Sequence, residues 1–111
     1  EFYQAVLGNS SVAAFNAAFA TVRTALQGNA AALGTVTLLR DHEVKHVAAL
    51  RTAISNLGAT PATYAPAATF DFTGGRGASG GGPFAPATRD LGFLLALTQA
   101  GEDTGVRAYK G

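Results

Sequence analysis

All four prolines of this 111-residue chain lie between Gly58 and Arg89, together with seven of its fourteen glycines. Proline clashes with the preceding helical turn and lacks a backbone donor, and glycine weakens helices. The stretches on either side are rich in alanine, leucine and valine and contain few such residues. The distribution therefore predicts an all-α chain in which helices flank a long irregular connection at residues 58–88.

Apolar spacing divides the flanking stretches into helical segments. The first pattern stops at Gly8, and because no cap precedes it we expect this helix to begin before residue 1. In the next segment apolar residues recur at intervals of three and four, with Ser10 or Ser11 as the N-cap. Gly58 is the expected cap at the end of the longest segment. The predicted helices cover residues 1–8, 10–27, 33–57 and 89–111.

Composition excludes several classes of protein. The eight basic residues are spread singly, and with seven acidic residues they leave a net charge of +1, so we expect no nucleic-acid groove. Without cysteine there is no disulfide or iron–sulfur cluster. A membrane-spanning helix needs a run of about 18 apolar residues, and this sequence contains none, so we expect no membrane span in it. Residues 75–80 match G-x-G-x-x-G, but no helix follows them and the Lys-Ser/Thr of a phosphate loop is missing, so we expect no nucleotide site.

Two glutamates lie on apolar helix faces. At about 100° per residue, Glu43 occupies the centre of the stripe of residues 33–57, and His46 lies within about 60° of it. Glu102 shares its side of the last helix with leucines and with Tyr109. A buried carboxylate costs several kcal/mol unless it is paired. The sequence therefore predicts a partner for Glu43, either a metal ion or a metal-free pair with His46 or Arg40.

The string His42-Glu43-Val44-Lys45-His46 has two metal-binding interpretations. As H-E-x-x-H it is the zinc-protease motif, which needs a third ligand. No further histidine exists, so Asp71, Glu102 or Asp103 would have to serve. As E-x-x-H it is the di-metal motif of four-helix bundles, in which Glu43 and His46 point into the core. Helix geometry favours the second interpretation, because His42 lies about 100° from the centre of the stripe.

Four blocks of sequence resemble the bacterial ferritin-like domain family that includes desiccation-associated proteins. They are residues 41–51, 56–61, 70–72 and 101–111, and Glu1-Phe2-Tyr3 is similar to the end of that family's first helix. The resemblance implies an incomplete ferritin-like bundle over residues 1–111. Residues 1–8 would end the first bundle helix and residues 10–27 would form an added helix. The second and third bundle helices, 33–57 and 89–111, would be joined by the crossover 58–88.

The same resemblance implies a set of metal ligands. Glu43 and His46 would form one E-x-x-H, and Glu102 would be a lone bridging glutamate. Glu1 is a weaker candidate for the ligand of the first helix, which the spacing places before residue 1. Tyr109 and Arg40 would be neighbours of the ligands. A second E-x-x-H would follow residue 111, so we expect no complete site in this chain.

The expected function is that of a ferritin-like protein with a di-iron or di-manganese centre. Its role would be oxidase, peroxide-detoxifying or stress-protective, with no catalytic residue assigned beyond the ligands. The alternative is a non-catalytic structural or interaction module of the cell envelope that uses the same fold. The resemblance also implies export to the periplasm or cell envelope, with a cytoplasmic location as the alternative. The partners it implies are further copies of the chain in a homo-oligomer or the components of a larger envelope assembly.

Overall fold

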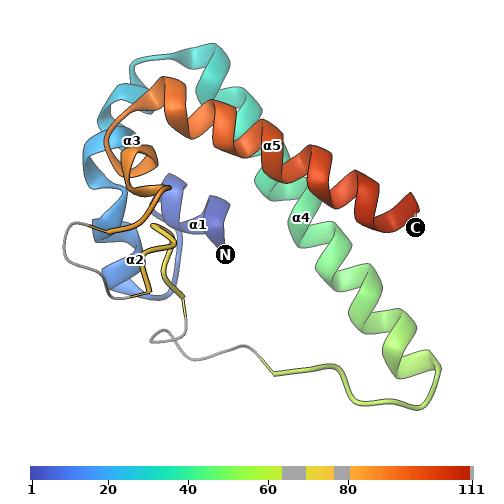
Figure 1. The fold of residues 1–111 in the computed structure, drawn as a ribbon. Coiled ribbons are helices and arrows are strands. Elements are labelled where there is room, and N and C mark those ends of the chain that lie inside the picture. The colour runs from blue at the N-terminus through green and yellow to red at the C-terminus, as the bar shows by residue number, and fades with distance from the viewer. Residues whose placement is uncertain (64–69, 77–80, 111) are drawn as a thin grey trace.

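The structure is a computed structural model that describes residues 1–63, 70–76 and 81–110. It is all-α, as predicted, and no strand occurs in these ranges. Figure 1 shows the arrangement of the helices along the chain. They are α1 (Phe2–Leu7), α2 (Ala13–Ala18), α3 (Ala20–Gln27), α4 (Ala30–Asn56), the short 3₁₀ helix η2 (Ala85–Thr88) and α5 (Leu91–Lys110). None of the described helices is long and apolar enough to span a membrane.

The segment predicted as one helix at residues 10–27 is two helices, α2 and α3, which meet at Phe19. Phe19 leaves the helical region at φ −104° and ψ 11°, and its side chain is fully buried. The serine prediction also needs correction, because Val12 is the N-cap of α2. The Ser10 hydroxyl instead accepts a hydrogen bond from the Val12 amide at 3.0 Å, in the turn before the helix.

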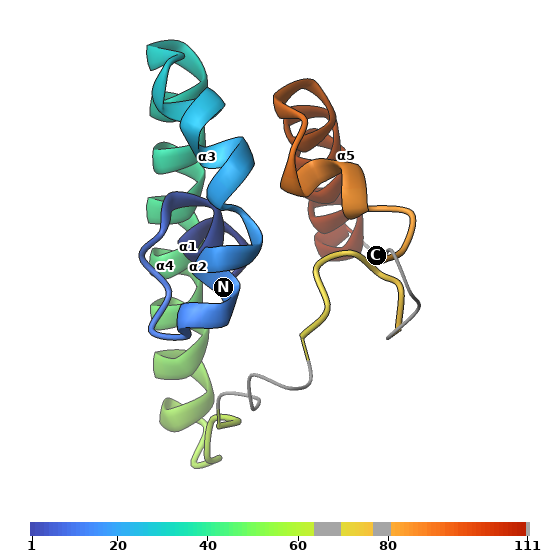
Figure 2. The same cartoon turned by 90° about the vertical axis from the view of Figure 1, so that its left-hand side faces the viewer.

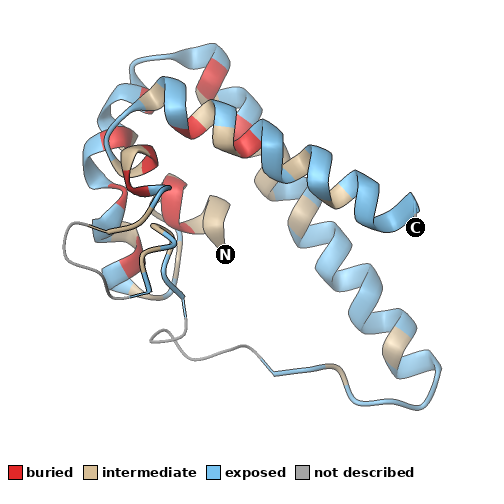
Figure 3. Cartoon of the chain, viewed as in Figure 1, coloured by how far each residue is buried: buried red, intermediate tan, exposed pale blue. Residues whose placement is uncertain are grey.

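The core lies where α1, α2, α3, the start of α4 and the start of α5 meet, and Figure 3 shows the buried residues gathered at that end. Phe72, from the long connection, makes edge contacts with the rings of Phe15 and Phe19. The aromatic residues of the connection predict contacts that fasten it to the helices, at Tyr64, Phe70, Phe72 and Phe84. Phe72 makes such contacts. Phe84 is 43% exposed, and Tyr64 lies outside the described residues. The buried apolar residues of the cluster are Ala5, Val6, Phe15, Phe19, Val22, Leu26, Ala32, Val36, Ala87 and Leu94.

Helix α4 begins at Ala30, three residues earlier than predicted, because the Asn29 side chain caps it by accepting from the Ala32 amide. Its end is closed by Gly58 in the left-handed region at φ 78°. There the Gly58 and Ala59 amides donate to carbonyls of the last turn in a Schellman arrangement. Twenty-seven residues make a rod about 40 Å long. Figures 1 and 2 show that its second half extends away from the core.

Helix α5 packs against η2 and α3 at its start, whereas α4 packs against α1 and α3. Because Phe93, Leu94 and Leu97 lie on its other faces, the sequence predicts a helix here that is buried all round or lies at an interface. In the structure only Leu94 and Thr98 of α5 are buried, and Phe93 and Val106 are exposed. Figure 2 shows α5 standing apart from α4. The apolar faces of the two long helices are therefore largely open within this chain.

Candidate metal centre

Glu43 and His46 lie on successive turns of α4 and contact each other. The Nδ1 atom of His46 is 3.1 Å from Oε1 of Glu43. The stripe that was expected to bury them is open, because Val44, Val47 and Leu50 are about half exposed. The side chains of His46 and Glu43 are accordingly 63% and 46% exposed. The described residues by themselves do not bury this pair, and there solvent removes most of the predicted cost of the charge.

Arg40 does not form the alternative pair with Glu43. Its Nε atom lies 2.6 Å from Oδ1 of Asp41, the next residue along α4. Arg40 and Glu43 nevertheless line the same cleft, which lies between α1 and α4 and has a volume of about 390 Å³. Arg40 is therefore a neighbour of Glu43 without being its hydrogen-bond partner.

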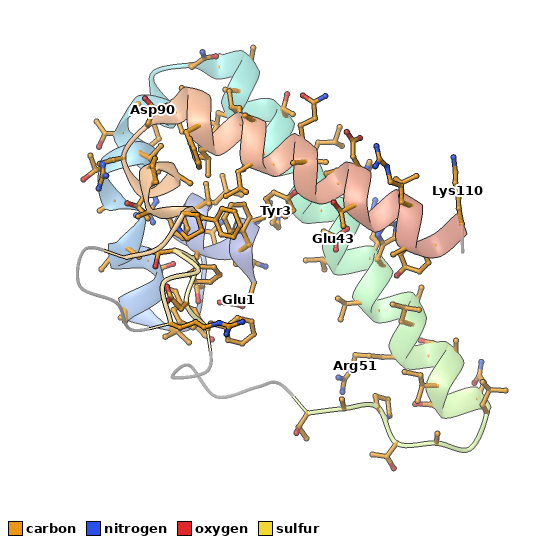
Figure 4. The ribbon with its side chains drawn as sticks, in the orientation of Figure 1. Glu1, Tyr3, Glu43, Arg51, Asp90 and Lys110 are labelled. Carbon is orange, nitrogen blue, oxygen red and sulfur yellow. The ribbon has the colours of Figure 1, made fainter. Side chains whose placement is uncertain are left out.

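The side chain of Glu102, on α5, forms a hydrogen bond with a residue of α1. The Tyr3 hydroxyl donates a short hydrogen bond to Oε1 of Glu102, across ninety-nine positions of sequence. Figure 4 shows Tyr3 beside α5, with Glu43 of α4 nearby. Burial raises the pKa of Tyr3 above its ordinary value, and so do the hydrogen bond and the negative charges of Glu102 and Glu43. Carboxylates from α4 and α5 therefore both act on one α1 hydroxyl.

Tyr3 lies on α1, a short helix with a well-defined end. Gly8 adopts φ 81°, and the amides of Gly8 and Asn9 donate to the carbonyls of Ala5 and Gln4, which closes the helix tightly. Sequence reasoning used Tyr3 only to mark the end of a helix and missed its hydrogen bond to Glu102. The available signal was the similarity of residues 1–3 to the end of a first bundle helix.

The two remaining candidates, Glu1 and Tyr109, lie near the ligands without joining them. The Glu1 carboxylate accepts from the Ser10 hydroxyl and lines the α1–α4 cleft together with Glu43. Tyr109 is 76% exposed and shares a shallow hollow with His46. Within the described residues, the tyrosine that donates to Glu102 is Tyr3.

The donor types fit iron or manganese, which bind carboxylate and imidazole ligands. Glu43 and His46 supply both types from one helix face, and Glu102 supplies a second carboxylate whose orientation Tyr3 fixes. Among residues 1–63, 70–76 and 81–110, however, no three His, Cys, Asp or Glu side chains come close enough together to hold a metal ion. The described residues thus provide donors suited to part of a centre. The three protein ligands of a zinc hydrolase do not assemble there either.

An all-α architecture with E-x-x-H on one long helix and a lone glutamate on another defines a ferritin-like arrangement. The family model of the ferritin-like domain matches residues 1–111. The chain therefore belongs to the ferritin-like domain family. No curated protein matches the chain, and no solved structure matches it. Its membership of the desiccation-associated branch stays a prediction.

Proposed function

We propose that this ferritin-like protein binds a di-iron or di-manganese centre through Glu43 and His46 of α4 and Glu102 of α5. The observation that carries the proposal is the Tyr3 hydroxyl, which bonds Glu102 and is influenced by the charge of Glu43. Di-metal bundles use two E-x-x-H motifs and two further glutamates. The candidates named here amount to one of each, so the centre needs ligands beyond the described residues.

Each of these residues would have a defined task. Glu43 and His46 bind from one face of α4, where their donor atoms already lie 3.1 Å apart. Tyr3 takes up one acceptor position on Oε1 of Glu102 and leaves other lone pairs of the carboxylate for a cation. Tyr3 keeps its proton and remains a donor at neutral pH, and its raised pKa extends this range further into alkaline pH. When bound, iron or manganese would supply reaction with oxygen or peroxide, which supports an oxidase, peroxide-detoxifying or stress-protective role.

Metal analysis of the full-length protein tests the proposal. The protein is incubated anaerobically with Fe(II) or Mn(II), desalted and measured by elemental mass spectrometry. We expect stoichiometric metal in the wild type and loss of metal in Glu43→Ala and Glu102→Ala. Asp103→Ala is the matched control, because Asp103 adjoins Glu102 but is exposed on α5. Wild-type protein without stoichiometric iron or manganese would rule out the centre.

The second candidate is a non-catalytic structural or interaction module of the cell envelope. The open apolar faces favour it, because Val44, Val47 and Leu50 of α4 and Val106 of α5 are each about half exposed. In this case Glu43→Ala would change stability and leave no oxidase activity to lose. Fractionation of cells and light scattering on the full-length protein test the expected export and the expected oligomer or envelope assembly. A cytoplasmic monomer would contradict this candidate.

A further inference from the structure

The hydroxyl of Thr98 stands out among the polar groups of the helices. Thr98 is 7% exposed on α5, and within the described part of the chain its Oγ1 is the buried side-chain polar atom without a hydrogen-bond partner. Helical threonines commonly donate to the carbonyl four residues earlier. Here four others do so, and Thr98 does not. These four are Thr24, Thr35, Thr52 and Thr104.

The Glu102 carboxylate lines the same hollow as Thr98 and is the acceptor to consider for this hydroxyl. Glu102 follows Thr98 by one helical turn, and helical side chains lean toward the N-terminus, so its carboxylate extends back over Thr98. Both residues line a hollow of about 590 Å³ between α4 and α5. Oε1 of Glu102 accepts from Tyr3, and among the described residues nothing donates to Oε2. An unused donor thus lies one turn from an unused acceptor.

We infer that Thr98 is a positioning residue for Glu102, whose Oε2 accepts from the Thr98 hydroxyl after rotation of the Thr98 side chain. A buried hydroxyl without a partner is unfavourable, and this bond removes the penalty. With Tyr3 on one oxygen and Thr98 on the other, the plane of the carboxylate is fixed. What Glu102 is positioned to bind rests on the proposed function, but the hydrogen bond does not require metal.

A double-mutant cycle on the metal-free, full-length protein tests the bond. Thr98→Val removes the hydroxyl with little change in shape, Thr98→Ser keeps it, and Glu102→Leu removes the acceptor. We expect Thr98→Val to lower Tm by about 4–8 °C in the wild-type background and to have little effect beside Glu102→Leu. Thr98→Ser should retain most of the wild-type Tm. Thr35→Val is the control, because Thr35 lines the same hollow but donates to the Ala31 carbonyl.

Two results would overturn the inference. A higher Tm in Thr98→Val would show that the hydroxyl is unpaired in solution, and an equal fall in both backgrounds would show that it bonds the Leu94 carbonyl. If Glu102→Leu does not fold, Glu102→Ala replaces it in the cycle, and the sign of the Thr98→Val shift alone still decides the first case. If the Thr98 and Glu102 substitutions are coupled in Tm but the protein binds no metal, the proposed function fails and this inference stands. If the protein binds stoichiometric metal but the two substitutions are not coupled, this inference fails and the proposed function stands.

Discussion

Arg23 of α3 should make the largest single polar contribution to holding α1 in place. Its Nε donates to the Val6 carbonyl at 2.8 Å, and its Nη2 donates to the carbonyls of Ala5 and Asn16 at 2.8 and 2.6 Å. Two of these carbonyls end α1, where the helix dipole also favours a positive charge. Because α1 carries Tyr3, the same contacts place the hydroxyl that orients Glu102.

The size of the effect follows from these three bonds. A hydrogen bond to a charged group contributes about 1.5–3 kcal/mol, and we take the lower end because Arg23 is partly exposed. Arg23→Ala should therefore lower the free energy of unfolding by about 4.5 kcal/mol. That is a large share of the roughly 5–15 kcal/mol typical of a domain. Arg23→Lys should recover only part of this loss, because one ammonium cannot reach three carbonyls as a guanidinium does.

Urea unfolding followed by far-ultraviolet circular dichroism measures these differences. Arg107→Ala is the control, because Arg107 is exposed in the last turn of α5 and should change the free energy of unfolding by less than about 0.5 kcal/mol. If Arg23→Ala falls within about 1 kcal/mol of Arg107→Ala, the contacts of Arg23 with α1 and α2 do not stabilise the fold and the reasoning fails.

Tyr3→Phe should change how stability depends on pH. Because the pKa of Tyr3 is raised in the fold, the unfolded chain loses its phenol proton first, so wild-type stability falls as pH rises above about 10. The variant should show a shallower fall in urea titrations at high pH, and equal slopes would contradict this. Gly82→Ala would place a Cβ 2.3 Å from the Gly75 amide nitrogen and should clearly lower Tm. Gly101 lies in open space on α5, so Gly101→Ala should raise the free energy of unfolding by about 0.5–1 kcal/mol. Equal Tm values for the two alanine variants would contradict the close approach of the Gly82 and Gly75 backbones.

The sequence was sufficient to predict the long helices and the connection, because proline and glycine act locally. The division between α2 and α3 was not predictable, since the apolar spacing continues through Phe19 without a break. It depends on tertiary packing, in which Phe19 is buried against Phe2 and Phe72. Helix periodicity likewise put Glu43 and His46 on one face but could not show whether another element covers that face.

The hydrogen bond from Tyr3 to Glu102 illustrates a second limit. The two residues are ninety-nine positions apart, so no local spacing relates them. Periodicity placed Glu102 on an apolar side of α5, and the structure then supplied its partner from α1. The candidate metal ligands were thus found from patterns in the sequence. The position of Tyr3, which orients Glu102, depends instead on how the helices pack together.

The second half of α4 has a thermodynamic consequence for His46. None of residues 44–56 is buried, and in water a helix of that length is only marginally stable without packing. Arg51 steadies it by donating to the Ala62 carbonyl at 3.1 Å, and Gly58 closes its end. A partner that covers Val47 and Leu50 would also suppress fraying of this half of α4, and it would restrict the rotation of the His46 side chain. Removal of water from this helix face and alignment of the His46 nitrogens are therefore thermodynamically coupled.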